Sequence, residues 1–555
     1  MKERIETAVR ETIMEWLEAS AQAGEAMPPI IITIPKDTTH GDFSTNVAMI
    51  VSKRAGKKAG EVAMEMQAQL NRKLEGQALC TVAGPGFINF TLTEDAGKKV
   101  FETLLAEGEA IGRSTIGAGK TVNIEYVSAN PTGPLTVGHG RNAAVGDVIA
   151  NLLAAVGYTV TREYYFNDAG NQMNVLAQSV RTRYRQLTGI HEELAEGGYQ
   201  GEYIKEIAEA VRKDYGDSLT ETEEHGIFKR YAIEATFAMI KETLGRMLIH
   251  HDVYFNEYSL YENGKIEETL KQIAEKGLSY EQDGAVWYKA TKYGAEKDRA
   301  LVKSTGEPTY RLPDIAYHID KYKRGYDRII DIFGADHIAQ YPDVLSCLKA
   351  LGYDTERVTV VVYQFVTLVR DGQVVKMSTR KANYITLDDL FDEVGVDAAR
   401  YFFVMRRLGS HLEFDLELAK KQTLDNPVFY VQYAHARICS IFQHAAETKP
   451  ELANREYRPE TTDAGMLEMA EEQELIRQLA QFKELVETAA ETCEPHRLTG
   501  YLEKLAELFH RYYNQHQIVV EDEAVAAARL ALVLVTRRVI KNGLTILGIQ
   551  APEHM

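Results

Sequence analysis

Residues 121–153, TVNIEYVSANPTGPLTVGHGRNAAVGDVIANLL, carry the clearest signal of the fold class. This stretch starts as an apolar strand that ends near Ser128, turns at 130–134 (NPTGP), and enters a helix at Thr136. A strand, a tight turn and a helix in this order are typical of the first unit of a nucleotide-binding parallel sheet. The free N–H groups and the positive dipole end at the start of such a helix favour phosphate. Gly138 would allow a ribose or base to approach the backbone, and His139 could donate to an oxygen.

Two other interpretations of this region need weighing. His139 could be only a helix-capping residue and Gly138 only a turn glycine, and the short pattern alone leaves that open. The preceding residues, Gly117-Ala118-Gly119-Lys120-Thr121, resemble part of a P-loop, but the full pattern needs a glycine where Ser114 stands and a helix after the lysine. Here the lysine leads into a strand, so a P-loop is excluded.

A second loop, within residues 366–395 (VTLVRDGQVVKMSTRKANYITLDDLFDEVG), carries phosphate chemistry of a different kind. A hairpin turn is predicted at Asp371-Gly372, and a helix is predicted after Thr386, whose N-cap role is supported by Asp389 three residues later. Between them lie three cations, Lys376, Arg380 and Lys381. Such a loop can clamp transferring phosphates as charge develops. Alone it would more simply be a solvated basic loop; together with the first loop it indicates a nucleotide site.

The 555 residues are too many for one hydrophobic core and predict a multidomain α/β protein. Residues 1–110 predict an α+β domain, and residues 425–555 an all-α bundle. Between them we expect a Rossmann-type parallel-sheet domain with a first half (111–177), a helical insertion (178–290), a second half (291–385) and a connecting helical segment (386–424).

Composition narrows the class of protein. The formal net charge of −18 excludes a generally basic coater of DNA, although one groove of an acidic enzyme can still bind nucleic acid. The charged N-terminal segment does not read as a signal peptide, and no apolar stretch is long enough to span a membrane. Four widely spaced cysteines, without CxxC pairs, argue against disulfides and structural zinc and favour a reducing, cytoplasmic location.

With both loops in view, the sequence resembles class I aminoacyl-tRNA synthetases, and within them the arginyl-tRNA synthetase family, along the whole chain. Thr136–His139 matches the first class signature and Lys376–Arg380 the second. Further matching stretches are HGDFSTNVAM, EYVSANPTGPLTVGHGRNA, FNDAGNQM, FGADH, DNPVFYVQYAHAR and LGIQAPEHM. The resemblance implies an additional N-terminal domain that contacts the tRNA elbow, a catalytic Rossmann domain and a helical anticodon-binding domain.

The activity that this resemblance implies is ATP-dependent formation of arginyl-adenylate, followed by transfer of the arginyl group to the 3′ end of tRNA(Arg). Mg²⁺ is expected with ATP, while no residue is expected to ligate a metal. The chain is expected to act as a monomer. A pocket of paired carboxylates should already reject lysine and citrulline, so a separate editing domain is unnecessary. No candidate for such a domain is visible in the sequence.

Site residues carried over from the resemblance fall into three groups. His139, Lys376 and Thr136 are expected to be catalytic. The ATP-binding set is Thr136, Gly138, His139, Asp336, His337, Lys376, Met377, Ser378 and Arg380. The arginine-binding set is Glu125, Asn130, Tyr310, Asp314 and Gln340.

The C-terminal bundle carries aromatic residues among basic and amide ones, and RNA loops are read by stacking bases on aromatics and by hydrogen-bonding base edges. Half of these residues could instead pack the bundle core, which we favour for Tyr433 and Phe509. The predicted tRNA-binding set is Tyr430, Gln432, His435, Arg437, Arg511, Tyr512 and Tyr513.

Two departures from the class signatures keep alternatives open. Thr136 replaces a histidine and Thr379 replaces a lysine, so the individual roles at these positions are undetermined. One alternative is another adenylate-forming enzyme of the class; the acids Glu125 and Asp314 argue against small or apolar substrates. The other is a catalytically silent tRNA-binding paralogue, which would not need Gly138, His139 or these acids.

Overall fold

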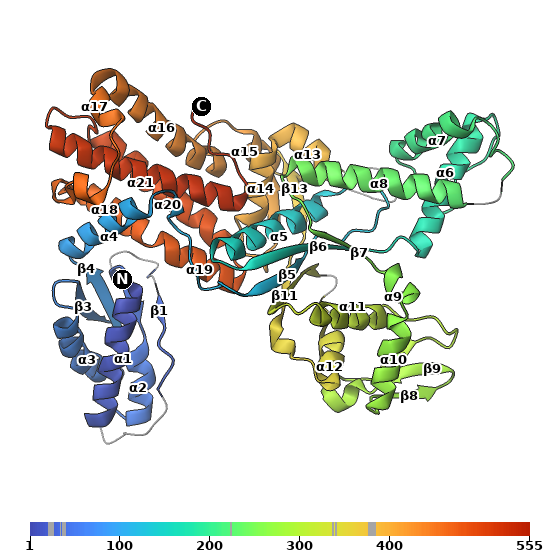
Figure 1. Cartoon of the computed structure of the whole chain (residues 1–555), viewed down its shortest axis with the longest axis horizontal. Helices are drawn as coiled ribbons and strands as arrows, with labels where there is room; N and C mark the ends of the chain where they lie inside the picture. Colours follow the sequence, from blue (N-terminus) through green and yellow to red (C-terminus); the bar gives the residue numbers. More distant parts are fainter. Residues whose placement is uncertain are drawn as a thin grey trace.

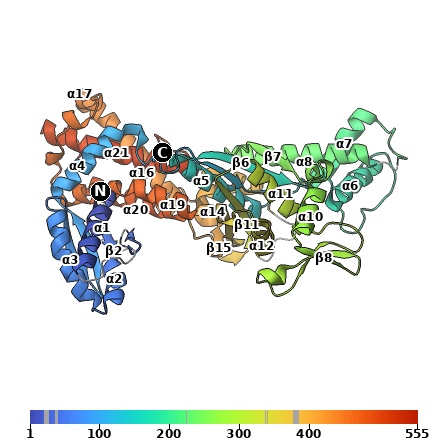
Figure 2. The same ribbon diagram turned by 60° about the horizontal axis from the view of Figure 1, so that its bottom comes forward.

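The computed structural model describes residues 1–19, 27–33, 35, 40–222, 225–335, 338, 341–375 and 385–555. This part of the chain is elongated, with a parallel sheet near its middle and a helical bundle on one side of it (Figure 1). On the other side lie two smaller units, one within residues 171–246 and one within residues 258–351. The N-terminal domain lies against the bundle, away from both smaller units, in each of two views (Figures 1 and 2).

The central sheet has five strands in the order β12-β11-β5-β6-β7, and every neighbouring pair is parallel. The chain leaves β5 for β6 on one side and later returns to β11 on the other, so β5 and β11 flank the point where strand order reverses. In open α/β sheets ligands bind at such a point, beyond the carboxyl ends of the strands. The strands are β5 (Thr121–Glu125), β6 (Thr159–Phe166), β7 (Val253–Asn256), β11 (Arg328–Gly334) and β12 (Val358–Tyr363). The predicted Rossmann-type sheet is confirmed.

Helix α5 (Val137–Ala155) follows β5 and is buried along most of its length. Its Gly146 permits a close approach to the buried ring of Tyr126, because a Cβ at this position would lie 2.2 Å from Tyr126 Cγ. The glycine therefore sets how closely the helix packs on the residues that follow β5.

Replacing Gly146 by alanine is expected to lower the free energy of unfolding by about 1–3 kcal/mol, because overpacking forces the helix and ring apart. Gly500, in α20 (His496–Gln515), is a matched control: its added Cβ would meet nothing within 4 Å. There alanine should be neutral or stabilising by about 1 kcal/mol through helix propensity. Thermal unfolding followed by circular dichroism compares the two, and equal midpoints would contradict the close-approach argument.

The N-terminal domain is an α+β unit with its own hydrophobic core, as predicted. Its antiparallel sheet has the order β1-β2-β4-β3 and is covered by helices. The elements are α1 (Lys2–Ala19), β1 (Ile32–Thr33), β2 (Phe43–Thr45), α2 (Val47–Ala55), α3 (Ala59–Lys73), β3 (Ala78–Ala83) and β4 (Phe87–Leu92); α4 (Glu94–Glu107) then leads to β5.

The predicted helical insertion at 178–290 contains helices, but the same range also contains the strands β7, β8 (Ser279–Gln282) and β9 (Ala285–Tyr288), which were not predicted. Helices α6 (Asn171–Leu187), α7 (Glu202–Tyr215) and α8 (Gly226–Arg246) do form one projecting unit with its own core. The chain then returns to the central sheet as β7, a four-residue, half-buried edge strand too short to give an apolar run. A further hairpin was missed although an Asp-Gly turn marks it, with φ of 52° at Asp283 and 75° at Gly284.

The second smaller unit packs four helices and a small antiparallel sheet around a separate core. Its elements are α9 (Tyr258–Glu262), α10 (Lys265–Glu275), β8 (Ser279–Gln282), β9 (Ala285–Tyr288), β10 (Arg299–Val302), α11 (Arg311–Lys323) and α12 (Tyr341–Leu351). The buried Lys321 of α11 also bonds Glu125 at the end of β5 and Asp331 within β11, which joins this unit to the central sheet.

The segment after β12 joins the sheet to the bundle. The predicted hairpin turn at Asp371-Gly372 is confirmed, as is the Thr386 cap, whose side chain accepts from the Asp389 N–H at 3.0 Å. The segment expected to be helical also contains a strand, β15, which pairs in parallel with β13. The elements are β13 (Val366–Arg370), β14 (Gln373–Val374), α13 (Leu387–Val394), α14 (Val396–Val404), β15 (Leu412–Asp415) and α15 (Leu416–Lys420).

The C-terminal residues form the predicted helical bundle, which shares one continuous core with the sheet domain. No helix among the described residues combines the length and apolarity needed to cross a lipid bilayer. The helices are α16 (Pro427–Thr448), α17 (Pro450–Ala453), α18 (Ala470–Ala480), α19 (Phe482–Thr492), α20 and α21 (Glu523–Leu547).

One buried arginine joins the bundle to α5. Arg400, in α14, is inaccessible to solvent, and its guanidinium pairs with Asp147 of α5. It also donates to the carbonyl of Met247 after α8 at 2.6 Å and to that of Leu547, at the end of α21, at 2.8 and 2.9 Å. Four distant segments therefore meet at one side chain.

Candidate active site

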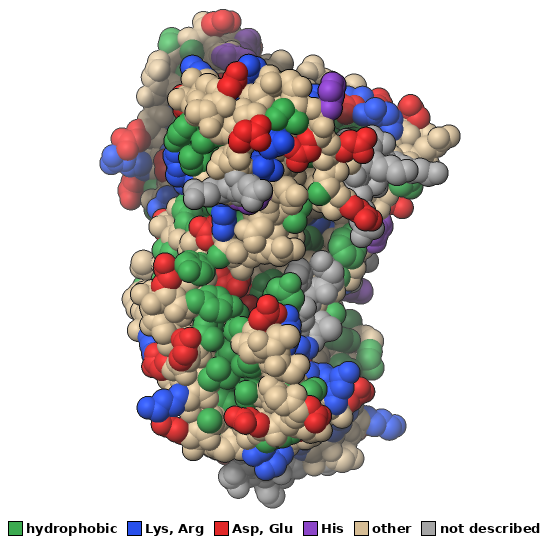
Figure 3. All heavy atoms as spheres, turned by 90° about the vertical axis from the view of Figure 1, so that its right-hand side faces the viewer, with side chains coloured by type: hydrophobic (Ala, Val, Ile, Leu, Met, Phe, Trp, Pro, Cys, Tyr) green, Lys and Arg blue, Asp and Glu red, His purple; other side chains and the backbone are tan. Residues whose placement is uncertain are grey.

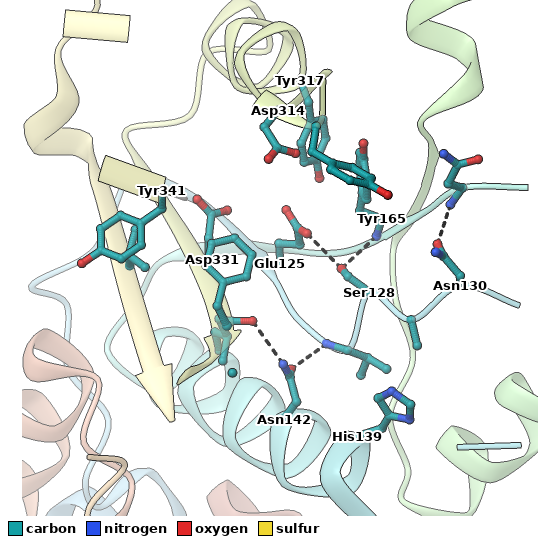
Figure 4. A pocket seen from close by; sticks show the side chains of 18 of the residues that line it. Glu125, Ser128, Asn130, His139, Asn142, Tyr165, Asp314, Tyr317, Asp331 and Tyr341 are labelled. Atoms are coloured by element: carbon teal, nitrogen blue, oxygen red, sulfur yellow. Dashed lines mark hydrogen bonds between the residues drawn. The ribbon is translucent and has the colours of Figure 1, made fainter. Parts of the chain in front are cut away.

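A cavity of about 500 Å³ opens at the carboxyl ends of β5 and β11, where strand order reverses (Figure 4). It is walled by the turn after β5, the start of α5, the first turns of α11 and α12, and the ends of β11 and β12. The position is the one expected for a nucleotide-binding sheet.

The start of α5 presents His139 to the cavity in a defined protonation state. The Thr136 N–H donates to His139 Nδ1 at 3.1 Å, so the proton of a neutral ring is on Nε2. Burial lowers the pKa of His139, which keeps the ring neutral. The His139 ring thus caps the start of α5 through Nδ1 and offers its Nε2–H to the cavity as a hydrogen-bond donor. Gly138 is exposed beside it, with only Thr136 Oγ1 near a hypothetical Cβ, at 3.8 Å.

Two carboxylates in the cavity lack a cationic partner among the described residues. Asp314, in the first turn of α11, has no hydrogen bond or ion pair from its carboxylate to any of these residues. Glu257, directly after β7, accepts only from neutral donors, the Tyr165 hydroxyl and the Asn167 amide, each at 2.8 Å. Since buried carboxylates are costly unless paired, this wall of the cavity suits a cationic ligand with two or more donors.

The electrostatics of this wall follow from burial. Burial raises the pKa of Asp314 to about 7; His318 opposes this shift, and the charges of Glu125 and Glu257 add to it. Burial also raises the pKa of Glu257, despite its two hydrogen bonds.

We therefore expect kcat/KM for a cationic substrate to rise with pH through an apparent pKa near 7. Below this value Asp314 is protonated and cannot pair with the cation; above it the carboxylate is ionised and binding is strongest. Initial rates between pH 5.5 and 8.5 would measure the dependence. Asp314→Asn should remove that inflection, and its persistence in this variant would assign the titration to another group.

The Glu125 carboxylate already has a cationic partner within the protein, Lys321. Its Oε2 accepts from Lys321 Nζ at 2.6 Å, and its Oε1 from the Ser128 hydroxyl at 3.0 Å. Lys321 also pairs with Asp331 at 2.6 Å. Burial disfavours the lysine charge, but Asp331 and Glu125 more than offset it and raise the pKa of Lys321. Glu125 lines the cavity, yet both of its oxygens are engaged within the protein.

The other predicted arginine-site residues that the structure describes also line the cavity. Asn130 accepts from the Asn167 N–H at 3.0 Å and donates to Gln172 at 3.1 Å. Tyr310 is 82% exposed, so its ring projects at the cavity mouth. The remaining predicted nucleotide- and arginine-site residues lie outside the described residues: Asp336, His337, Gln340, Lys376, Met377, Ser378 and Arg380.

Several cavity residues were missed by the sequence analysis. Glu257 was missed because β7 was not recognised as a strand. Without that strand, the rule that polar residues after parallel strands meet at one sheet edge could not be applied to Glu257. Asp331, which lines the cavity, pairs with the buried Lys321 only through the fold, so nothing local in the sequence marks it. Asn142, Tyr165 and Tyr317 also line the cavity.

Two predicted tRNA-binding residues need correction. Tyr512 is fully buried and its hydroxyl donates to Glu472, so it cannot stack on a base without unpacking the bundle. His435 is also buried and is bonded to the carbonyl of Pro552. Both belong to the bundle's interior.

The other five members of that set are accessible to some degree. Gln432 already bonds Asp397 and the Gln550 carbonyl, and Arg511 pairs with Glu474. Arg437 lies 4.7 Å from the ring centroids of both Tyr433 and Tyr513. Tyr430 packs on His510. Their role in binding tRNA stays a prediction.

Comparison with known proteins places these features in one family. Residues 1–92 match the model "Arginyl tRNA synthetase N terminal domain", residues 100–404 "tRNA synthetases class I (R), catalytic domain", and residues 431–555 "DALR anticodon binding domain". The chain belongs to the arginyl-tRNA synthetase family.

Similar members of the arginyl-tRNA synthetase family come from bacteria. Arginine–tRNA ligase of Chlorobium phaeobacteroides (strain BS1) is 47% identical over 543 residues, covering 97% of this chain and 98% of the relative. That of Chlorobaculum tepidum is 48% identical over 545 residues, with the same coverage. The solved arginyl-tRNA synthetase of Thermus thermophilus has a TM-score of 0.76 at 21% identity, covering 99% of this chain and all of that structure, which supports the fold.

Proposed function

We propose that this chain is an arginine–tRNA ligase, which activates L-arginine with ATP and transfers it to the 3′ end of tRNA(Arg). The observation that carries the proposal is the juxtaposition of Asp314 and Glu257, two carboxylates without a cationic partner among the described residues, with the helix start at His139 in one cavity. A planar guanidinium, always charged and rich in donors, suits two carboxylates.

In the first step, a carboxylate oxygen of arginine attacks the α-phosphorus of ATP. A new P–O bond forms as the bond to the bridging oxygen breaks, and pyrophosphate leaves with that electron pair. The His139 Nε2–H and the free N–H groups of α5 stabilise phosphate oxygens. Lys376 and Arg380 would bind the leaving pyrophosphate. Mg²⁺ is proposed to accompany ATP and to neutralise its phosphates.

In the second step, a hydroxyl of the terminal tRNA ribose attacks the arginyl carbonyl and AMP leaves. Figure 3 looks at the side of the molecule on which the two smaller units lie, and hydrophobic side chains gather near the middle of this face. Exposed hydrophobic patches of this kind mark docking sites. The exposed Tyr310 at the cavity mouth supports entry of the RNA end there. In the bundle, Tyr430, Gln432, Arg437, Arg511 and Tyr513 are the proposed tRNA contacts.

The remaining proposals concern where and in what state the enzyme works. One chain supplies all three family domains and the walls of the cavity, which supports activity as a monomer. All four cysteines are free and buried, which suits the reducing cytoplasm.

The test is ATP–pyrophosphate exchange with each amino acid in turn, with and without total tRNA. Exchange only with arginine is expected, and exchange with another amino acid would overturn the pocket assignment. Arginine exchange without tRNA would show that adenylate formation does not depend on tRNA. Silence throughout, from folded protein that binds tRNA, would leave a non-catalytic paralogue.

A further inference from the structure

The turn after β5 has an unfavourable backbone conformation. Val127 has φ of 67° and Ser128 has φ of 43°, two consecutive non-glycine residues in the left-handed region. This region is costly for a β-branched residue such as valine and persists only where the surroundings enforce it. Both residues line the cavity, so the cost falls on the active site itself.

One side chain bonds the backbone of this turn at Val127. Asn142, one helical turn into α5 beyond His139 and only 5% exposed, accepts the Val127 N–H on its Oδ1 at 2.6 Å. Its Nδ2 donates to the carbonyl of Ile332 in β11 at 3.1 Å (Figure 4). The amide thus joins the turn after β5 to the end of β11, across the point where strand order reverses.

Other residues of the turn are bonded to β5 and β6. The Ser128 hydroxyl donates to Glu125 and accepts from the Tyr165 N–H at 3.1 Å. The carbonyl of Ala129 accepts from the Tyr164 hydroxyl at 2.7 Å. Asn130 follows directly. Its Oδ1 accepts from the Asn167 N–H, and the Asn167 amide donates to Glu257. A change at Val127 would therefore move Asn130 and, through Asn167, one of the two carboxylates proposed to bind arginine.

We propose that Asn142 is a positioning residue for arginine activation. By holding Val127 in the left-handed conformation and tying it to β11, it fixes the arginine-binding wall relative to the nucleotide-binding end of the sheet. This inference rests on the proposed function, because it concerns the same reaction. Asn142 acts through the backbone of the turn and not as a proton donor in the reaction.

The first experiment compares Asn142→Ala with a control in the exchange assay. Asn142→Ala is expected to raise the KM for arginine at least tenfold, because Val127 relaxes from its left-handed conformation. Asn151, also on α5 and partly buried, bonds Asp147 and the Ile546 carbonyl, away from the cavity. Asn151→Ala should change that KM less than threefold. Equal effects of the two variants would overturn the proposal.

The second experiment separates positioning from general stability. Glycine adopts φ near 67° without strain, so Val127→Gly removes the need for the clamp. The loss caused by Asn142→Ala should then be at least fivefold smaller in the Val127→Gly background than in the wild-type background. Additive losses would overturn the proposal, as would an Asn142→Ala chain that circular dichroism shows unfolded in both backgrounds.

The wild-type enzyme distinguishes failure of this inference from failure of the proposed function. No arginine-dependent exchange by the wild type would refute the proposed function. Calorimetric titration with arginine gives a readout that needs no turnover. In the Kd for arginine, the loss caused by Asn142→Ala should again be smaller in the Val127→Gly background than in the wild-type background. An active wild type with an unaffected Asn142→Ala variant would refute only the positioning role.

Discussion

Asp314→Ala is expected to raise the KM for arginine by about 100-fold, since truncating one partner of a buried charge pair costs about 2–5 kcal/mol. The KM for ATP should change less than about threefold, because Asp314 is on the α11 wall of the cavity and the helix start at His139 is on the α5 wall. Exchange kinetics at pH 8, where the wild-type carboxylate is ionised, measure both constants.

Asp320→Ala is the matched control for this prediction. Asp320 is on the same helix, α11, but pairs with Lys265 and Arg324 and does not line the cavity. Its replacement should leave both constants near wild type. If Asp314→Ala raised the two KM values equally, Asp314 would hold the cavity's shape and would not be the arginine partner.

Arg400→Leu is expected to lower the free energy of unfolding by about 3–5 kcal/mol, because the buried Asp147 loses its nearest cationic partner and keeps only Arg162, at 3.9 Å, and the Asn151 amide. It also removes donors from the carbonyls of Met247 and Leu547. Thermal unfolding should show a large fall in midpoint, shared by the sheet domain and the bundle because they have one core.

Arg212 supplies the comparison for Arg400. It forms an ion pair with Asp217 near the surface, with side chains 41% and 62% exposed, and it donates to the Leu187 carbonyl at 2.7 Å. Arg212→Leu should cost less than about 1 kcal/mol, since exposed pairs contribute little. A similar fall in midpoint for both variants would mean that burial of the Arg400 pair does not matter.

How far the sequence predicted the structure depended on how local each signal was. The unit from β5 to α5, the hairpin at Asp371-Gly372 and the Thr386 cap were all predicted, because neighbouring residues determine them. By contrast β7, four residues at a sheet edge, carries almost no pattern of its own, and Glu257 was lost with it. The missing carboxylate is half of the proposed guanidinium site.

Side-chain environments were predicted less well than elements. The acids Glu125 and Asp314 look equivalent in sequence, yet one is paired with Lys321 and the other has no partner among the described residues. Only long-range pairing makes that difference. In the bundle, Tyr512 and Tyr513 are adjacent on one helix, and a single residue step decides that the first is buried and the second is not.

The contacts of Arg400 also affect the order in which parts of the chain can fold during translation. Its guanidinium donates to the carbonyl of Leu547, and His435 is bonded to that of Pro552, and both carbonyls are synthesised after the sheet domain. Chains grow from the N-terminus, so the sheet domain emerges with a buried cation lacking one of its acceptors. The nascent sheet domain should therefore stay loosely packed until α21 docks against it.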